Sequence, residues 1–344
     1  MTTKESGSKL LDGISMNTLQ QDVTPESAPV STGNRAKSQP ETVSIVRRTL
    51  RTMAACIGLA TATYAPVVLA ADPLLSLVGP DEWNLPILQS KNLFLASGLA
   101  QVNSSVYDNN GHSHSIPESD VYGTLVRFAH MFAFDSLPGV GFGVEYLQPV
   151  LDIERLIPGQ SITGLGDPLF ELGVYFKPVP GLTLGYLNVP SLPMGSMELS
   201  KHFWSDASTF IWNYHTGKFG FNGTFAIGFS STQHSGGEDT HIGNWYGTEV
   251  TALYEVTRWL APFIGFSYHK NEAAHDAITG AEAPGQSPLY SCLLPGGCHE
   301  ELLGGGVNLH FAPKHTLSVW YYAGIEGSNV VKNNSTYLLY THPF

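Results

Sequence analysis

The chain has 344 residues, of which 42% are hydrophobic and only 13% are charged, and its formal net charge is −12. A soluble domain carries about 25% charged residues, so the composition argues against one, and the acidic balance argues against nucleic acid as a partner, because nucleic acid selects basic surfaces. Glycine (36 residues) and aromatic residues (17 Phe, 15 Tyr and 6 Trp) are abundant, as in lipid-facing strands separated by turns.

The N-terminal 70 residues read as two segments. Residues 1–45 are rich in Ser, Thr, Gln and Pro, so we expect a disordered extension. Residues 46–70 have the pattern of a cleaved signal peptide, with Arg47, Arg48 and Arg51 before an apolar run and a small-residue cleavage site at Ala70. The run of roughly 17 residues is short for a transmembrane anchor, which is the alternative. Because an extension before a signal is unusual, we hypothesise that translation starts near Val46.

No later stretch reaches the ~20 apolar residues that a membrane helix needs. The sequence therefore predicts a protein that is exported to the outer membrane of a Gram-negative cell without a helical anchor. The part after Ala70 has 10 Lys and Arg against 24 Asp and Glu. Cys56 lies in the signal, so Cys292 and Cys298 remain as a pair that we expect to form a loop disulfide in an oxidising compartment.

Residues 71–92 are unusually apolar for a segment that precedes the first strand. We interpret them as an N-terminal periplasmic segment or as a plug that folds into the lumen.

From residue 93 to Phe344, apolar and polar residues alternate with a period of two. In the clearest case, Phe219, Phe221 and Phe225 fall on one face and Asn222 and Thr224 on the other. The pattern predicts an all-β protein, a transmembrane antiparallel up-and-down outer-membrane β-barrel of about 12 strands. The predicted strands are 93–106, 120–133, 139–151, 162–176, 181–190, 203–215, 218–231, 243–256, 258–270, 300–312, 315–326 and 334–344.

The connections between these strands alternate strictly in length. The short ones are 135–138, 177–180, 216–217, the residues near 257, and 313–314. The long ones are 107–119, 152–161, 191–202, 232–242, 271–299 and 327–333. Short periplasmic turns and long extracellular loops are typical of outer-membrane barrels, whereas a soluble sandwich has no reason to alternate loop lengths.

The last strand ends in an aromatic residue, Phe344, on the same face as Leu338 and Tyr340. The barrel-assembly machinery recognises such a strand, so we expect that machinery to be a partner. We also expect outer-membrane lipid and lipopolysaccharide as partners.

Charged residues on the inward parity are candidates for lining the lumen: Arg127, Glu145, Asp167, Glu171 and Glu249, to which Glu301 and His310 are added with less support from the parity. Arg127 could pair with Glu145 or with Asp167, because neighbours on one face of antiparallel strands meet side by side. Two interpretations stay open: a charged constriction that selects permeants, and a salt-bridged brace that fills a narrow barrel.

Histidines gather in the predicted outer loops, at 112, 114, 202, 234, 241, 275 and 299. A metal site or a pH-sensitive gate is one interpretation. Solvated loop histidines are the interpretation that we favour, and we expect no metal.

Three stretches resemble an outer-membrane family, the meta-pathway phenol degradation family: Asp120–Arg127, Gly143–Pro149 and the glycine-rich Gly164–Pro168. The resemblance extends from about residue 93 to Phe344. It implies a barrel that transports hydrophobic or aromatic compounds linked to a degradation pathway, and it implies no catalytic residues. The ending His342-Pro343-Phe344 and the 271–299 loop depart from the family pattern.

The sequence thus favours a channel or transporter for small molecules, with a small hydrophobic permeant and no cofactor. A barrel enzyme that acts on lipid is the first alternative, but Ser and His occur together only in loops, at 112–115 and 234–235, and on no lipid-facing strand. A structural or adhesin barrel is the second.

Overall fold

The computed structural model describes residues 89–154, 161–196, 199–235, 238–286, 291–312 and 314–344. All of them belong to the second of the two units into which the chain divides, residues 50–344. The predicted extension, the signal peptide and most of the 71–92 segment lie outside these ranges. Within the described ranges, every regular element is a β-strand, and no helix is long and apolar enough to cross a membrane.

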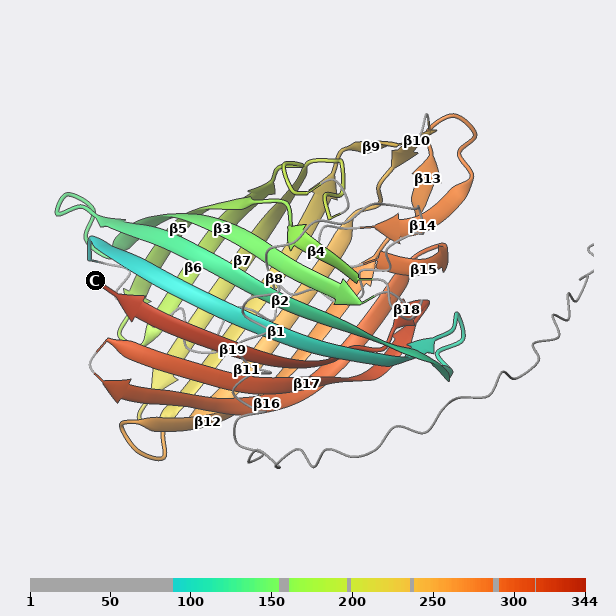
Figure 1. Cartoon of the computed structure of the whole chain (residues 1–344). Coiled ribbons are helices and arrows are strands. Elements are labelled where there is room, and N and C mark those ends of the chain that lie inside the picture. The colour runs from blue at the N-terminus through green and yellow to red at the C-terminus, as the bar shows by residue number, and fades with distance from the viewer. Residues whose placement is uncertain (1–88, 155–160, 197–198, 236–237, 287–290, 313) are drawn as a thin grey trace, which may run out of the picture. The chain divides into compact units, whose positions relative to one another are not determined.

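Twelve antiparallel strands close into a barrel (Figure 1). In the order in which they pair, they are β1 (Lys91–Tyr107), β2 (Ser113–Ala133), β3 (Val140–Glu154), β5 (Leu169–Val179), β6 (Leu182–Ser191), β7 (Ser205–Thr216), β8 (Phe219–Ser230), β11 (Trp245–Tyr254), β12 (Leu260–Asn271), β16 (Cys298–Ala312), β17 (His315–Ser328) and β19 (Asn334–Pro343). The barrel closes because β1 pairs with β2 on one side and with β19 on the other. The predicted up-and-down barrel of about 12 strands is confirmed.

The alternating pattern separates a lipid-facing surface from an interior. Phe219, Phe221 and Phe225 are exposed on the outside, while Asn222 and Thr224 of the same strand are buried inside. Each strand finds hydrogen-bonding partners on both sides, which is what a backbone in hydrocarbon requires. The fold therefore follows from one condition, that no strand edge is left open to lipid.

The two ends of the barrel differ as the sequence predicts. At one end, tight turns join β2 to β3, β5 to β6, β7 to β8, β11 to β12 and β16 to β17. Gly181 (φ 82°) and Gly217 (φ 59°) supply the positive φ angles of two of these turns. The two barrel termini meet at this end, where the Phe344 amide donates to the Asn92 carbonyl at 3.0 Å.

The long connections form additional structure that the sequence did not predict. Five short strands, β9 (Thr232–Ser235), β10 (Glu238–His241), β13 (Ala274–Asp276), β14 (Glu282–Gln286) and β15 (Ser291–Pro295), form a second sheet in the order β15-β14-β13-β10-β9 (Figure 1). A further strand, β18 (Val330–Val331), pairs with the last residues of β1. Segments of two to five residues are too short to show periodicity in a sequence.

The predicted strand 162–176 is divided in two. Its first part, β4 (Ser161–Leu165), and its second part, β5, both pair with β3. Between the pairs Val150–Leu165 and Leu147–Leu169, two residues of β3 oppose the three residues 166–168, so the strand bulges there.

Candidate functional site

The barrel interior is a mixed surface of apolar and polar side chains. Leu95, Ile211, Leu302, Tyr322 and Tyr337 are among the fully buried ones, and they belong to one continuous cluster. The sequence led us to expect polar inward faces, but several strands are apolar on both faces: in β1, Leu95 points inward while Phe94 pairs with Phe128 on the lipid side. A lumen of this kind offers apolar contacts along its length.

Aromatic side chains form an arc on one part of the inner wall. The rings of Trp320 and Tyr337 are stacked, with centroids 5.2 Å apart, and Phe263 lies 6.4 Å from Trp320. Tyr322 lies against the wall and donates a hydrogen bond to Glu249 Oε1 at 3.0 Å. Gly304 makes room for this, because a Cβ at that position would lie 2.6 Å from Tyr322 Cδ1.

Charged side chains form a second arc, on β2, β3 and β5. Arg127 holds Glu145 through two hydrogen bonds, Nε to Oε1 at 2.5 Å and Nη2 to Oε2 at 3.1 Å. Glu171 lies opposite Glu145 on the neighbouring strand and accepts a bond from the Tyr175 hydroxyl at 3.2 Å. A permeant would therefore meet aromatic side chains on one part of the inner wall and charged side chains on another.

The predicted lumen candidates are thus placed as follows. Arg127, Glu145, Glu171 and Glu249 are buried in the interior on membrane-spanning strands, and Asp167 is buried at the bulge before β5.

Two further candidates have a different outcome. On β16 the inward residue is Glu300, which is fully buried, and not its neighbour Glu301. His310 is half-buried, with its Nδ1 3.0 Å from Thr316 Oγ1. If the start of a strand is misjudged by one residue, counting alternate positions from it assigns side chains to the wrong face.

Asp167 anchors the segment between β6 and β7 to the inner wall. Its Oδ1 accepts a hydrogen bond from the Gly195 amide at 2.9 Å, and its Oδ2 accepts one from the Lys201 amide at 3.0 Å. Ser196 adds two bonds to Leu165, with its amide donating to the Leu165 carbonyl at 2.7 Å and its hydroxyl accepting from the Leu165 amide at 2.8 Å. Arg127 therefore pairs with Glu145, while the Asp167 carboxylate is engaged by backbone amides.

The glycine-rich stretch at 164–168 is what permits this docking. A Cβ on Gly164 would lie 2.5 Å from Ser196 Oγ, and one on Gly195 would lie 2.8 Å from the carbonyl carbon of Gly166. Leu199 of the docked segment packs with inward-facing Val121, Ile153 and Ile162 at the long-loop end of the barrel. The glycines at 164 and 195 thus allow two backbones to approach closely.

Burial lowers the pKa of Lys201, in the same segment, to about 8, and the nearby Asp167 carboxylate opposes part of that shift. This lysine therefore titrates close to physiological pH, in contrast to a solvated lysine.

A Ser–His pair that sequence reasoning missed lies on β12. Ser267 Oγ is 2.6 Å from His269 Nε2. The spacing i, i+2 on a strand puts both on one face, and that signal was present in the sequence. Both side chains point into the interior, and Ser267 is 0% exposed.

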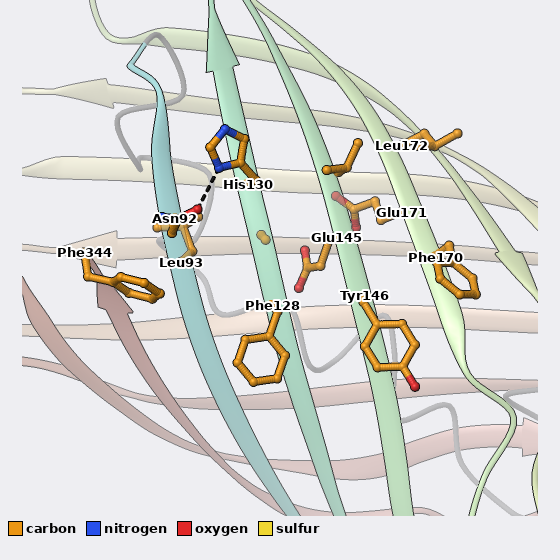
Figure 2. A pocket seen from close by; sticks show the side chains of 12 residues that line it. Asn92, Leu93, Phe128, His130, Glu145, Tyr146, Phe170, Glu171, Leu172 and Phe344 are labelled. Atoms are coloured by element: carbon orange, nitrogen blue, oxygen red, sulfur yellow. Dashed lines mark hydrogen bonds between the residues drawn. The ribbon is translucent and has the colours of Figure 1, made fainter.

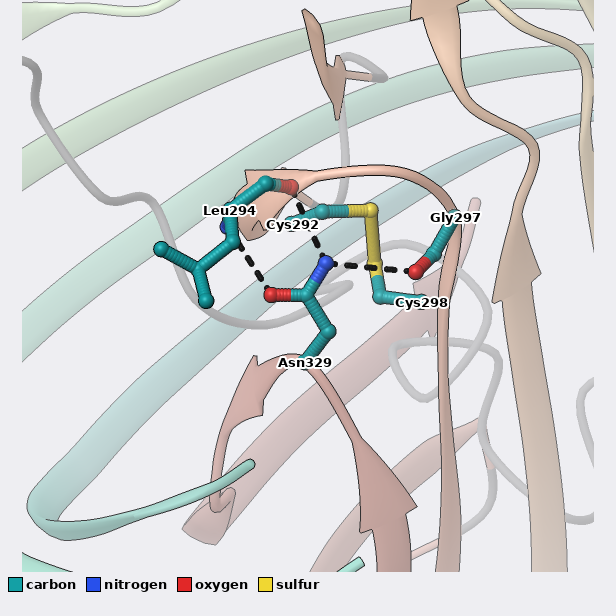
Figure 3. The surroundings of a disulfide bond; sticks show 5 residues. All are labelled: Cys292, Leu294, Gly297, Cys298 and Asn329. Carbon is teal, nitrogen blue, oxygen red and sulfur yellow. Dashed lines mark hydrogen bonds between the residues drawn. A yellow bond between two sulfur atoms is a disulfide. The ribbon is translucent and has the colours of Figure 1, made fainter. Parts of the chain in front are cut away.

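A disulfide joins Cys292, in β15 of the second sheet (hereafter the outer sheet), to Cys298, the first residue of β16 (Figure 3). Asn329 lies next to it with a positive φ of 57°, which Asn tolerates better than most residues. Its Nδ2 donates to the carbonyls of Leu294 (3.0 Å) and Gly297 (3.2 Å), and its Oδ1 accepts from the Leu294 amide (2.8 Å). These bonds join the 291–297 loop to the β17–β19 connection.

The loop histidines pair locally. His112 and His114 both contact Asp108 Oδ2, at 3.4 Å and 2.9 Å. The bond from His114, with the backbone bonds from residues 112 and 110, lowers the pKa of Asp108. His234 contacts Asp239 at 2.6 Å. In the part of the chain that the structure describes, no three His, Cys, Asp or Glu residues are arranged to hold a metal ion.

The lipid-facing surface carries a hollow of about 550 Å³ over β1, β2, β3 and β5 (Figure 2). Its rim is aromatic, formed by Phe128, Tyr146, Phe170 and the C-terminal Phe344. The wall is one strand thick here, so this apolar hollow lies directly outside the Arg127–Glu145 pair.

Comparison with known proteins identifies the family. A family model described as "Putative MetA-pathway of phenol degradation" matches residues 104–340. The COG4313 outer membrane channel from Pseudomonas putida F1 has a similar structure, with a TM-score of 0.64 at 14% identity, over 74% of this chain and 96% of that one. No curated protein sequence matches the chain.

Two further barrels match less well. A Pseudomonas aeruginosa FadL homologue matches with a TM-score of 0.39 at 10% identity, over 81% of this chain and 94% of that one. The CymD monoaromatic hydrocarbon channel matches with a TM-score of 0.42 at 9% identity, over 81% and 99%. The TM-score of the P. putida structure supports the assignment of the fold.

Proposed function

Because the chain belongs to the family described as "Putative MetA-pathway of phenol degradation", we propose that it is an outer-membrane channel for small hydrophobic or aromatic compounds. The observation that carries the proposal is the continuous cluster of apolar and aromatic side chains inside a barrel whose outer face is also apolar. A pore for hydrophilic solutes would be lined by polar groups and water. An apolar lining instead lowers the free energy of a hydrophobic solute throughout its passage.

The charged arc supports the same function. Arg127 and Glu145 neutralise each other, so they brace the wall without holding an open ionic path. A neutral solute is not repelled by such a pair, and it gains contact with the aromatic rings of the inner wall.

Uptake by intact cells tests the proposal. A porin-deficient Gram-negative host with and without the protein is given radiolabelled toluene or radiolabelled lactose, and the initial uptake rate of each is measured. Faster toluene uptake with unchanged lactose uptake is expected. Equal increases for both solutes would indicate an aqueous pore, and no increase for either would contradict a channel.

A barrel enzyme is a second candidate because of the Ser267–His269 pair. A hydrolase needs a nucleophile that its substrate can reach. Ser267 is buried and points away from lipid, so the pair is arranged to satisfy its own hydrogen bonds. Release of fatty acid from phospholipid vesicles by purified protein, lost in Ser267→Ala, would favour the enzyme.

The remaining parts of the proposal concern export and assembly. A cleaved signal at 46–70 would direct the chain to the assembly machinery, and the strand that ends in Phe344 would be recognised there. Lipid and lipopolysaccharide would surround the mature barrel. Single-channel conductance measured with and without residues 71–92 tests whether that segment is a plug, because only a plug would raise conductance when removed.

A further inference from the structure

A groove runs over the lipid-facing side of β1, β2, β3, β5 and β6. The hollow of about 550 Å³ over β1, β2, β3 and β5 continues into a second hollow of about 610 Å³, and Val144 and Leu172 line both. These two side chains belong to one row, in which each residue pairs with the next across the sheet: Asn92, His130, Val144, Leu172 and Asn188. The row alternates with buried inward residues, so it faces lipid. The groove therefore follows a single row of the barrel wall.

Aromatic side chains border the groove on both sides. On the long-loop side, the next outward row consists of Phe94, Phe128, Tyr146 and Phe170. On the turn side, it consists of Phe132, Phe142, Val174 and Tyr186. The rings of the first row contact each other in pairs, with centroids 5.3 Å apart. Val144 and Leu172 project less far from the sheet than these rings do, so a trough remains between the two rows.

The groove is polar at one end and apolar along its middle. Asn92 is the second residue of β1 from the turn end, whereas Leu172 is the eighth residue of β5 from that end. The row therefore passes from the periplasmic edge of the barrel into the hydrocarbon region, as the stagger of tilted strands requires. At the edge, His130 Nδ1 lies 2.7 Å from Asn92 Oδ1 (Figure 2). A polar pair that opens into an apolar trough matches the order of groups in a phospholipid, with its headgroup at the interface and its acyl chains inside.

We propose that this groove binds one phospholipid of the periplasmic leaflet, with an acyl chain along Val144 and Leu172 and the phosphate beside Asn92 and His130. The position of the groove identifies the occupant, because its face is continuous with the apolar surface that the barrel turns to lipid. Amide and imidazole N–H groups are donors, and a phosphate accepts hydrogen bonds and carries negative charge. An imidazolium donates from both nitrogens, so His130 can hold Asn92 and the phosphate together.

Lipid titration of the full purified barrel tests the acyl-chain part of the site. Delipidated protein in detergent is titrated with dioleoylphosphatidylethanolamine, and native mass spectrometry gives the Kd of the first and of the second bound lipid. We expect the first lipid to bind about tenfold more tightly than the second, because one hydrogen bond to a charged group supplies that factor. Val144→Trp fills the trough and should abolish the difference. If that variant does not fold, Leu172→Trp fills the same trough.

Val250→Trp is the matched control for the trough. Val250 is an outward valine on β11 with nearly the same exposure, 42% against 40% for Val144, and it lines neither hollow. The control places the same indole on the lipid-facing surface outside the groove. It should keep the tighter first lipid.

His130→Leu tests the headgroup part of the site. It should weaken phosphatidylethanolamine about tenfold and leave dioleoylglycerol, which lacks the phosphate, within about twofold of the wild type. His315→Leu is the matched control. His315 is also a half-buried outward histidine near the turn end, with its Nδ1 2.7 Å from the Tyr340 hydroxyl, but it lines neither hollow. This control should change neither affinity.

The outcomes decide the inference separately from the channel function, which toluene uptake tests. Equal affinities of the first and second lipid in the wild type, or a tighter first lipid that survives in a folded Val144→Trp or Leu172→Trp, would overturn the site. Equal weakening of both lipids by His130→Leu would overturn the placement of the headgroup. A dimer of the wild type that dissociates in Val144→Trp would assign the groove to a second copy of the chain instead.

Discussion

Replacing Asp167 by Asn is expected to release the segment between β6 and β7 from the inner wall. The carboxylate accepts bonds from the amides of Gly195 (2.9 Å) and Lys201 (3.0 Å), and a hydrogen bond to a charged group contributes about 1.5–3 kcal/mol. Asn keeps one neutral acceptor and turns a donor toward the other amide, so we expect a loss of about 3 kcal/mol. Because about 1.4 kcal/mol is a factor of ten, the ratio of docked to released segment should fall about 100-fold.

Hydrogen–deuterium exchange of the full protein in micelles measures this ratio directly. When the segment closes faster than its open amides exchange chemically, the amides of Gly195 and Lys201 should exchange about 100-fold faster in the variant. Asp206→Asn is the matched control, because Asp206 accepts only side-chain bonds from Asn188 (2.8 and 2.7 Å). Unchanged exchange over 192–204 in Asp167→Asn, or an equal increase in the control, would refute the assignment of the anchor.

Three further expectations follow from buried or cross-linked groups. Arg127→Met leaves Glu145 charged and unpaired in the interior, so it should destabilise the barrel by about 3–5 kcal/mol in urea titrations, and adding Glu145→Leu should restore most of that; failure of the double variant to recover would count against a brace. The pKa of Lys201 is lowered to about 8 in the docked state, so docking is disfavoured below that pH and favoured as pH rises toward the ordinary lysine value. Exchange of the segment should accordingly slow between pH 7 and 9.5 after correction for intrinsic rates, and Lys201→Gln should abolish this dependence. Removing the disulfide by Cys292→Ser should cost about 2 kcal/mol of local stability and speed proteolysis within 272–297, and an unchanged cleavage rate would show that Asn329 and the outer sheet hold the loop without it.

The sequence predicted the barrel because the constraint on a membrane strand acts residue by residue. Hydrocarbon requires an apolar face and full backbone pairing, so Phe219, Phe221 and Phe225 reveal the lipid side without knowledge of their neighbours. Loop lengths added the direction of each strand, and parity placed Arg127, Glu145 and Glu249 on the inner face. The inward position of Glu300 was missed, because counting alternate positions from an uncertain strand start erred by one residue.

The candidate site was less predictable, because its contacts depend on which side chains meet inside the barrel. Tyr322 reaches Glu249 across two intervening strands, and Ser267 and His269 are recognised as a pair only when both are seen to face the interior.

What the sequence determined by itself is the number of strands, their order and the face that each presents to lipid, since these depend on local periodicity and on the tendency of chain neighbours to pair. Only the tertiary structure decided that Asp167 binds backbone amides while Arg127 takes Glu145. Both choices satisfied the inward parity, and the register between β3, β5 and the segment after β6 fixed which groups meet. Contacts across a closed barrel depend on curvature and stagger, which no alternation of residue types encodes.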